Sequence, residues 1–318
     1  MKAIALCFIC SSMTILSCTA QIFENTVVTN STFIASSFIT DNEGWLIDNN
    51  GKLWHTNNGS LAWDSSVTEH HFLKMDFTDG LHAFALEADI AYKTSDGGYT
   101  WSPLVVPGII GKSLFFLDSQ TGFISGRYTI FRTADGGENW STIETDDVSF
   151  LDYYFISPLL GIASAYDEES NRNLWRTTDG GLTWMNVFNE RNFYMNSVWL
   201  TNETTGWAAG YYDRFGIKEP AILRTTDGGQ TWKSAYRNVY VDSRGESLYD
   251  IRFRNEMEGY AISRYAYDVY TSDGGTNWYL AHAADTLGLS PQYGIYKVLD
   301  GYSDMYLIGR RGNIAIWK

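Results

Sequence analysis

Thr225-Thr226-Asp227-Gly228-Gly229-Gln230-Thr231-Trp232 is one of five close copies of the motif Thr/Ser-x-Asp-Gly-Gly-x-x-Trp in this chain. The other copies begin at Thr94, Thr133, Thr177 and Thr271, and a degenerate sixth copy runs from Thr56 to Trp63. The central residues lie at 58, 96, 135, 179, 227 and 273, which gives steps of 38, 39, 44, 48 and 46 residues. Periods of this size indicate a repeat architecture.

Each part of the motif has a structural explanation. Copies follow short apolar runs such as Ile222-Leu223, and Asp-Gly-Gly between two such runs predicts a hairpin turn. The carboxylate can accept hydrogen bonds from backbone N–H groups of its own turn, the glycines supply positive φ, and the Trp can pack between neighbouring sheets. We therefore expect the central aspartates to be structural rather than catalytic or metal-binding: Asp96, Asp135, Asp179, Asp227 and Asp273.

A weaker motif precedes each turn: an apolar residue, a small polar residue two positions later, and then Gly followed by an aromatic or apolar residue. Phe116-Leu117-Asp118 before Gly122-Phe123 is an example, and the chain has seven such units against six Asp-type turns. The last unit stops at Lys318, before a fourth strand could form. The sequence therefore predicts an all-β fold, a seven-bladed β-propeller of four-stranded antiparallel blades, whose last blade is closed by an N-terminal strand within residues 27–34.

The first 18 residues are typical of a bacterial signal sequence, with Lys2 followed by an apolar stretch from Ala3 to Leu16. Ile15-Leu16-Ser17-Cys18 matches a lipobox, in which Cys18 would carry lipid; the alternative is ordinary cleavage after Ala20. We expect residues 1–18 to be the signal or lipoprotein peptide and residues 19–318 to form a single propeller. The protein would then be exported, either as a membrane-anchored lipoprotein or as a periplasmic or secreted protein.

Composition excludes several classes of function. The net charge of −14 disfavours nucleic acid as a partner, so we expect membrane association only through the lipid anchor. No His, Cys and Asp cluster has metal-ligand spacing, and the Gly-Gly pairs follow Asp in hairpins rather than opening helices, as a phosphate-binding loop would. The sequence therefore predicts neither a metal nor a cofactor.

The repeat unit resembles a known family. Thr205-Gly206-Trp207-Ala208-Ala209-Gly210, together with Ala221-Ile222-Leu223-Arg224-Thr225-Thr226-Asp227-Gly228-Gly229, is similar to the Asp-box (BNR) repeat of the photosystem II assembly and stability factor family. That resemblance, over residues 24–318, implies a non-catalytic scaffold that binds a protein partner. The Asp box also occurs in sialidases, sortilin-type receptors and xyloglucan-degrading enzymes, so the repeat is more informative about fold than about function.

Arg and Tyr recur in the segments that join the Gly-aromatic strand to the next strand. These segments would lie at the end of the propeller opposite the Asp boxes, and they contain Arg127, Tyr128, Tyr211, Tyr212, Arg214, Arg264, Tyr265, Arg310 and Arg311. Such a composition is favoured at protein interfaces. The family resemblance, which includes an arginine-rich patch, implies the same role for Arg127, Arg264, Arg310 and Arg311. The competing interpretation is solvated hairpin tips whose Arg side chains pair with nearby Asp or Glu.

Two carboxylates support an alternative function. Asp152 and Asp250 occupy equivalent positions three residues before Phe155 and Phe253, so both would face the central channel and could serve as general acid and base. A polar, hydrated channel without catalysis is the competing explanation. The favoured prediction is an exported, non-catalytic scaffold with an envelope protein as partner; the alternative is a carbohydrate-binding or sialidase-like propeller.

Overall fold

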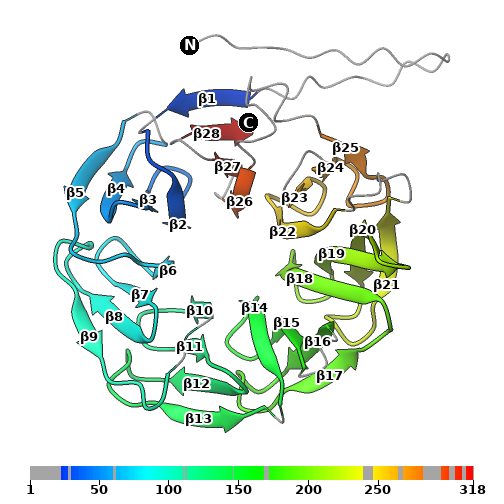
Figure 1. Cartoon of the computed structure of the whole chain (residues 1–318), viewed down its shortest axis with the longest axis horizontal. Helices are drawn as coiled ribbons and strands as arrows, with labels where there is room; N and C mark the ends of the chain where they lie inside the picture. Colours follow the sequence, from blue (N-terminus) through cyan, green and yellow to red (C-terminus); the bar gives the residue numbers. More distant parts are fainter. Residues whose placement is uncertain are drawn as a thin grey trace.

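Strands arranged in a closed ring form all the regular structure that the computed structural model describes (Figure 1). It describes residues 23–27, 30–59, 62–109, 111, 113–145, 147–167, 172–238, 246–263, 268–281, 295–300, 305–309 and 313–317, with side chains from residue 30 to 281 except at 172 and 173. The strands pair into seven four-stranded antiparallel sheets, and each sheet contacts the next through its innermost strand.

Six blades consist of four consecutive strands, numbered here from the innermost strand outward. Blade 1 is β2 (Phe33–Phe38), β3 (Gly44–Asp48), β4 (Lys52–Thr56) and β5 (Asp64–Val67). Blade 2 is β6 (Lys74–Phe77), β7 (Ala83–Glu87), β8 (Ile90–Thr94) and β9 (Ser102–Leu104). Blade 3 is β10 (Ser113–Phe116), β11 (Gly122–Ser125), β12 (Thr129–Thr133) and β13 (Ser141–Glu144).

The other three consecutive blades follow the same order and include the longest strands. Blade 4 is β14 (Ser149–Phe155), β15 (Gly161–Tyr166), β16 (Arg172–Thr177) and β17 (Met185–Phe188). Blade 5 is β18 (Phe193–Leu200), β19 (Gly206–Arg214), β20 (Ile217–Thr225) and β21 (Lys233–Arg237). Blade 6 is β22 (Leu248–Phe253), β23 (Gly259–Ser263), β24 (Val269–Thr271) and β25 (Tyr279–Leu280).

The remaining sheet is composite. It pairs β26 (Ile295–Asp300), β27 (Met305–Gly309) and β28 (Asn313–Trp317) with the N-terminal β1 (Phe23–Val27). Six blades are therefore complete four-stranded units of continuous chain, and the remaining sheet gains its fourth strand, β1, from the other end of the chain. β26 contacts both β22 and β2, so this sheet fills the space between blades 6 and 1.

The expected position of the closing strand was wrong. The closing strand ends where the expected one was to begin: β1 pairs with β28 in the register Phe23↔Trp317 to Val27↔Asn313. Phe33 instead begins β2, the innermost strand of blade 1, where Phe33 and Ala35 are buried. Both stretches have strand character, and the choice between them depends on which one reaches β28, a long-range pairing that local pattern does not determine.

The strand order gives the ring two different ends. The Asp-box turns and the turns between first and second strands lie at one end, which we call the Asp-box end. The turns between second and third strands and the links between blades lie at the other, which we call the linker end. β1 begins beside Trp317, which ends β28, so the chain enters the ring at the Asp-box end.

Each Asp box is closed by its own hydrogen bonds. Asp227 Oδ1 accepts from the backbone N–H of Thr231 at 2.9 Å and from Thr225 Oγ1 at 2.8 Å, and its Oδ2 accepts from Thr231 Oγ1 at 2.6 Å. Equivalent bonds to the residue four positions on are made by Asp96, Asp135, Asp179 and Asp273. These aspartates are therefore acceptors that hold the turn.

The core lies between blades as well as within them. Trp232, 7% exposed, closes blade 5 and belongs to an apolar cluster that also contains Ile162 and Leu174 of blade 4. Gly229 has a φ of 84°, and a Cβ there would lie 2.8 Å from Ile162 Cγ2. The second glycine of the motif therefore allows both the turn conformation and the close approach of one blade to the preceding one.

Replacing Asp227 with Ala should destabilise the protein by about 1–3 kcal/mol, because it removes the acceptor for three donors. Urea unfolding monitored by tryptophan fluorescence measures the change. Thr226→Ala, at an exposed position of the same turn, is the matched control and should alter stability by less than about 0.5 kcal/mol. Equal losses for both variants would contradict the assigned role.

Candidate binding site

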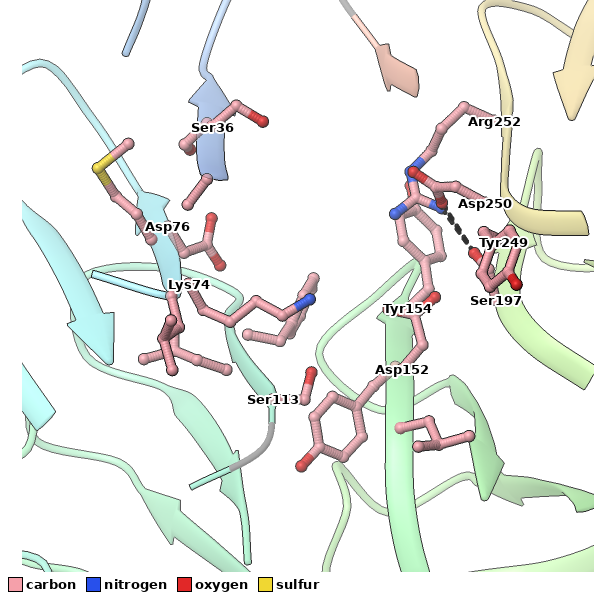
Figure 2. Close-up of a pocket in the computed structure, with 18 of the residues that line it drawn as sticks. Ser36, Lys74, Asp76, Ser113, Asp152, Tyr154, Ser197, Tyr249, Asp250 and Arg252 are labelled. Carbon is pink, nitrogen blue, oxygen red and sulfur yellow. Dashed lines mark hydrogen bonds and ion pairs between the residues drawn. The ribbon is translucent and has the colours of Figure 1, made fainter. Parts of the chain in front are cut away.

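A cavity of about 410 Å³ occupies the central channel and is lined by residues of the innermost strands (Figure 2). Alternate residues of a strand point to the same face, so positions two apart face the channel together. Lys74 and Asp76 come from β6, and Asp250 and Arg252 come from β22. Figure 2 shows the first pair across the cavity from the second.

The channel carboxylates are engaged by neighbouring blades. Asp76 Oδ2 accepts from the backbone N–H of Phe116 at 2.7 Å, and Asp152 Oδ2 accepts from that of Val198 at 3.1 Å. In both cases the donor belongs to the innermost strand of the next blade along the chain. These hydrogen bonds join adjacent sheets where no strand ladder connects them.

Asp250 is held even more firmly. Its Oδ1 lies 2.8 Å from Arg252 Nη1 and accepts from Ser197 Oγ at 2.9 Å, and the Asp250 and Arg252 side chains are 10% and 14% exposed. Asp152 and Asp250 therefore both line the channel, where the sequence placed them, but each serves as an acceptor between blades. A general acid or base would have to leave these partners or act while bound to them.

Lys74 differs from the other charged groups of the channel. Its side chain is exposed and points into the cavity from β6 (Figure 2). Among the residues with described side chains, it makes no ion pair or hydrogen bond. Of the channel residues whose side chains are described, Lys74 is therefore the cation that a ligand could bind.

Two aromatic rings of the channel wall lie against each other. Tyr154 and Trp199 have centroids 4.0 Å apart, and Arg252 lies 5.1 Å above the Trp199 ring. Both rings also line a second cavity of about 400 Å³ toward the Asp-box end, bordered by Phe38, Phe77 and Phe116. Both ends of the channel thus combine polar and apolar lining groups.

Arg127 and Tyr128 form the turn between β11 and β12 at the linker end. The Arg127 guanidinium lies 4.9 Å from the centre of the Tyr128 ring, and its Nη2 donates to the tyrosine oxygen at 3.3 Å. Tyr128 has a φ of 61°, a conformation that is unusual for a bulky residue. The turn therefore presents a stacked, cationic and aromatic pair at the expected end.

Tyr211, Tyr212 and Arg214 lie within β19, not in a loop as the sequence suggested. β19 and β20 continue their ladder to the pair Arg214↔Ile217, so the inserted residues lengthen a hairpin. We call its outer part, Tyr211–Pro220, the long hairpin. The reason is the alternation of side chains along β20. Ile217, Glu219 and Ala221 lie on one face of that strand, and the short apolar run Ile222-Leu223 alone did not show that the strand begins so early.

Charged groups of the long hairpin pair with one another and with the neighbouring β21. Glu219, 2% exposed, lies 3.4 Å from Arg214 Nη1 and 3.2 Å from Arg237 Nε. Arg237 also lies 4.6 Å above the Tyr212 ring. Glu219 and Arg237 were missed by sequence reasoning, because only the ladder brings them to Arg214. Arg214 therefore follows the competing interpretation, a rim arginine paired with a carboxylate.

Tyr211 stacks on Tyr194 with ring centroids 4.8 Å apart and an interplanar angle of 8°. Lys218 lies 4.7 Å above the Tyr211 ring. The predicted site residues Arg264, Tyr265, Arg310 and Arg311, and the predicted lipidation site Cys18, lie outside the described residues. The structure thus brings together the long-hairpin residues and separately presents Arg127 with Tyr128.

A buried acidic pair lies near the linker end of blade 6. Asp268 is 4% exposed and Glu246 also 4%, and Asp268 Oδ1 accepts from the backbone N–H of Ser263 at 2.7 Å. Burial raises the pKa of Asp268 to about 7, the negative charge of Glu246 acts in the same direction, and the hydrogen bonds from Ser263 oppose it.

Within the part of the chain that the structure describes, no group of three or more His, Cys, Asp and Glu side chains could hold a metal ion. In the same residues, no helix has the length and apolar character needed to cross a membrane.

Comparisons with known proteins identify the fold. No model of a known protein family matches the sequence, and no curated protein matches it. Among solved structures, YCF48 bound to a D1 peptide matches with a TM-score of 0.69 and 19% identity, over 93% of this chain and 96% of that chain. YCF48 from Cyanidioschyzon merolae matches with a TM-score of 0.69 and 17% identity, over 93% and 98%.

The GH74 xyloglucanase from Xanthomonas campestris matches with a TM-score of 0.64 and 11% identity, over 92% of this chain and 53% of that chain. The chain therefore has the propeller fold of these structures, and its match to the two YCF48 structures confirms the predicted resemblance at the level of fold. At these identities the likeness to each structure concerns the fold alone.

Asp250→Asn should destabilise the propeller by about 3 kcal/mol, because it leaves the largely buried Arg252 without its counter-charge. The double variant Asp250→Asn with Arg252→Gln should recover part of that loss, which a double-mutant cycle of unfolding free energies measures. Additive losses from the two substitutions would show that the pair is not coupled.

Asp268→Asn should stabilise the protein above pH 7 by an amount on the order of a few kcal/mol, and have little effect near pH 4. Between about pH 4 and pH 7, Asp268 keeps its proton in the folded state but has lost it in the unfolded state. Wild-type stability therefore falls as pH rises from about 4 to about 7 through this group, and the asparagine variant lacks that fall. Thermal unfolding across this pH range is the measurement, and parallel pH profiles would contradict the assignment.

Proposed function

We propose that this protein is an exported, non-catalytic propeller that binds a segment of an envelope protein at its linker end. The observation that carries the proposal is the engagement of the channel carboxylates. Asp76 and Asp152 accept backbone N–H groups of the next blade, and Asp250 is paired with Arg252. Groups used in this way hold the ring together, which favours recognition over acid–base chemistry.

The linker end has the composition of a protein-binding surface. Arg127 and Tyr128 form a stacked pair there, and the long hairpin adds Tyr211 and Tyr212. Interfaces are enriched in these residue types because they combine large contact area with charge and hydrogen bonding. The sequence adds Arg264, Arg310 and Arg311 as further candidates for this surface.

The comparison with YCF48 supports a peptide as ligand. That protein has the same fold and is seen bound to a D1 peptide. We carry over only the general mode, recognition of a protein segment by a propeller, and not the identity of that partner. Lys74, exposed in the channel mouth, is suited to receive a carboxylate of such a segment.

The location in the envelope rests on the signal-like first 18 residues and on Cys18 as the lipid-bearing residue. The chain enters the ring at the Asp-box end through β1. A lipid on Cys18 would therefore be attached on the side away from the linker end. This arrangement leaves the proposed binding surface directed away from the anchor.

A carbohydrate ligand is the second candidate. Tyr154, Trp199 and Tyr249 line the same cavity as Asp152 and Asp250, and aromatic faces combined with polar groups suit sugar rings. Because both carboxylates already hold hydrogen bonds or an ion pair within the protein, this alternative favours sugar binding over sugar hydrolysis.

The test is to recover the tagged protein from its own host after light crosslinking and to identify what co-purifies. Changing Arg127, Arg264, Arg310 and Arg311 together to Glu should reduce recovery of the partner at least about tenfold. Asp152→Asn should retain the partner. Recovery of polysaccharide in place of protein would instead favour the carbohydrate alternative.

Arg127→Glu and Lys233→Glu form a matched pair, because Lys233 is exposed on the outermost strand of blade 5, away from the linker end. Only the first should weaken binding. Circular dichroism and thermal unfolding confirm that each variant is folded. We call Arg127, Arg264, Arg310 and Arg311 together the arginine surface. Full partner binding by a folded quadruple variant would contradict the assignment of binding to these residues.

A further inference from the structure

The tip of the long hairpin has an unusual residue in its turn. Phe215 and Gly216 connect β19 to β20, and their φ angles are 54° and 87°. A two-residue hairpin turn with positive φ at both positions is a type I′ turn, which prefers Asn-Gly or Asp-Gly. Phe at the first position adopts a conformation that bulky side chains avoid, at a cost of about 1 kcal/mol or more.

The same residue is also fully solvent-exposed. Phe215 is 99% exposed, the most of the large hydrophobic residues in the described part of the chain. It therefore contributes no packing to the described part of the propeller. A strained backbone and an exposed aromatic ring both cost free energy, and among the described residues no contact offsets either cost.

The long hairpin is held in place by contacts below its exposed tip. Glu219 is buried between Arg214 and Arg237, and the Gly216 N–H donates to Asp213 Oδ1 at 2.7 Å. The backbone N–H of Glu246 donates to the Lys218 carbonyl at 2.8 Å, which ties the hairpin to the chain entering blade 6. Such an arm loses little conformational entropy when its tip is bound.

The surroundings of Phe215 indicate the character of the partner. Arg214, whose side chain is 55% exposed, and the exposed Lys218 flank the tip, and Ile217 is 38% exposed beside it. Asp213, opposite Lys218 in the ladder, and Glu219, paired with Arg214, balance these two cations. The tip is thus an exposed apolar side chain on a hairpin end without net charge, and a complementary surface would hold an apolar pocket.

The position of the arm favours a protein over a membrane. β19 spans nine residues from Gly206 to Arg214, so the tip lies about 25 Å from the Asp-box end, where the chain enters the ring. A lipid anchor attached through β1 would hold that opposite end nearest the membrane. The arm then points toward proteins in solution or in a neighbouring complex.

We propose that Phe215 is the anchor by which this protein docks a protein partner that offers an apolar pocket. The proposal rests on the proposed protein-binding function but assigns it to a residue outside the arginine surface. A rigid arm presenting one exposed aromatic side chain matches the few-residue anchors that dominate interface energetics.

Phe215→Asn separates function from folding. Asn is preferred at this turn position, so the variant should have an unchanged or higher unfolding temperature, while partner recovery from the host should fall at least about tenfold. Tyr99→Asn is the matched control, because Tyr99 is 82% exposed in an Asp-box turn at the other end. It should leave recovery unchanged.

A photo-crosslinking probe identifies what touches the tip. p-Benzoylphenylalanine placed at position 215 in the native host should give one dominant adduct with the protein whose recovery depends on Phe215, and the same probe at position 99 should not. An adduct with lipid, or with a second copy of this chain, would overturn the proposal. So would undiminished recovery of the partner by Phe215→Asn.

The outcomes distinguish this proposal from the arginine surface. Loss of the partner in the quadruple arginine variant, but not in Phe215→Asn, leaves the proposed function standing and removes Phe215 as anchor. Loss only in Phe215→Asn assigns docking to the hairpin. Retention in both variants removes both assignments.

Discussion

The close approach of each Asp-box turn to the preceding blade is the constraint on which the ring depends. A Cβ at Gly275 would lie 2.0 Å from Trp207 Cη2, and one at Gly98 would lie 2.6 Å from Leu53 Cδ2. Only glycine allows the backbone to come so near an apolar side chain of the neighbouring sheet. The motif therefore shapes its own turn and also sets the spacing between sheets, which is why it recurs once in nearly every blade.

Ring closure also determines what the channel can do. Innermost strands of adjacent blades share no ladder, so their free N–H groups need acceptors, and Asp76 and Asp152 provide them. Asp250 with Arg252 and Ser197 performs a similar service between blades 5 and 6. The carboxylates of the channel are thus largely paired within the protein. Lys74, in the channel mouth, is the charged group that is available for recognition among the described residues.

Blade 5 shows how added chain length can be used without disturbing the ring. Its insertion extends an existing hairpin, whose hydrogen-bond ladder satisfies the added backbone groups. Buried Glu219 with its two arginines stiffens this extension, and Phe215 occupies the tip. Departure from preferred turn chemistry at one exposed position, with regular structure around it, is the pattern expected of a functional site.

The sequence by itself determined the repeat, the strand order within a blade, the hydrogen-bonding role of residues such as Asp227 and the channel-facing positions of Asp152 and Asp250. These are local properties, set by turn chemistry and by alternation along a strand. Only the tertiary structure decided that Phe23–Val27 closes the ring, that Asp250 pairs with Arg252, and that Arg214 belongs to a buried carboxylate. Those outcomes depend on pairing between distant strands and on which side chains the ladder brings together, and neither is encoded in a local pattern.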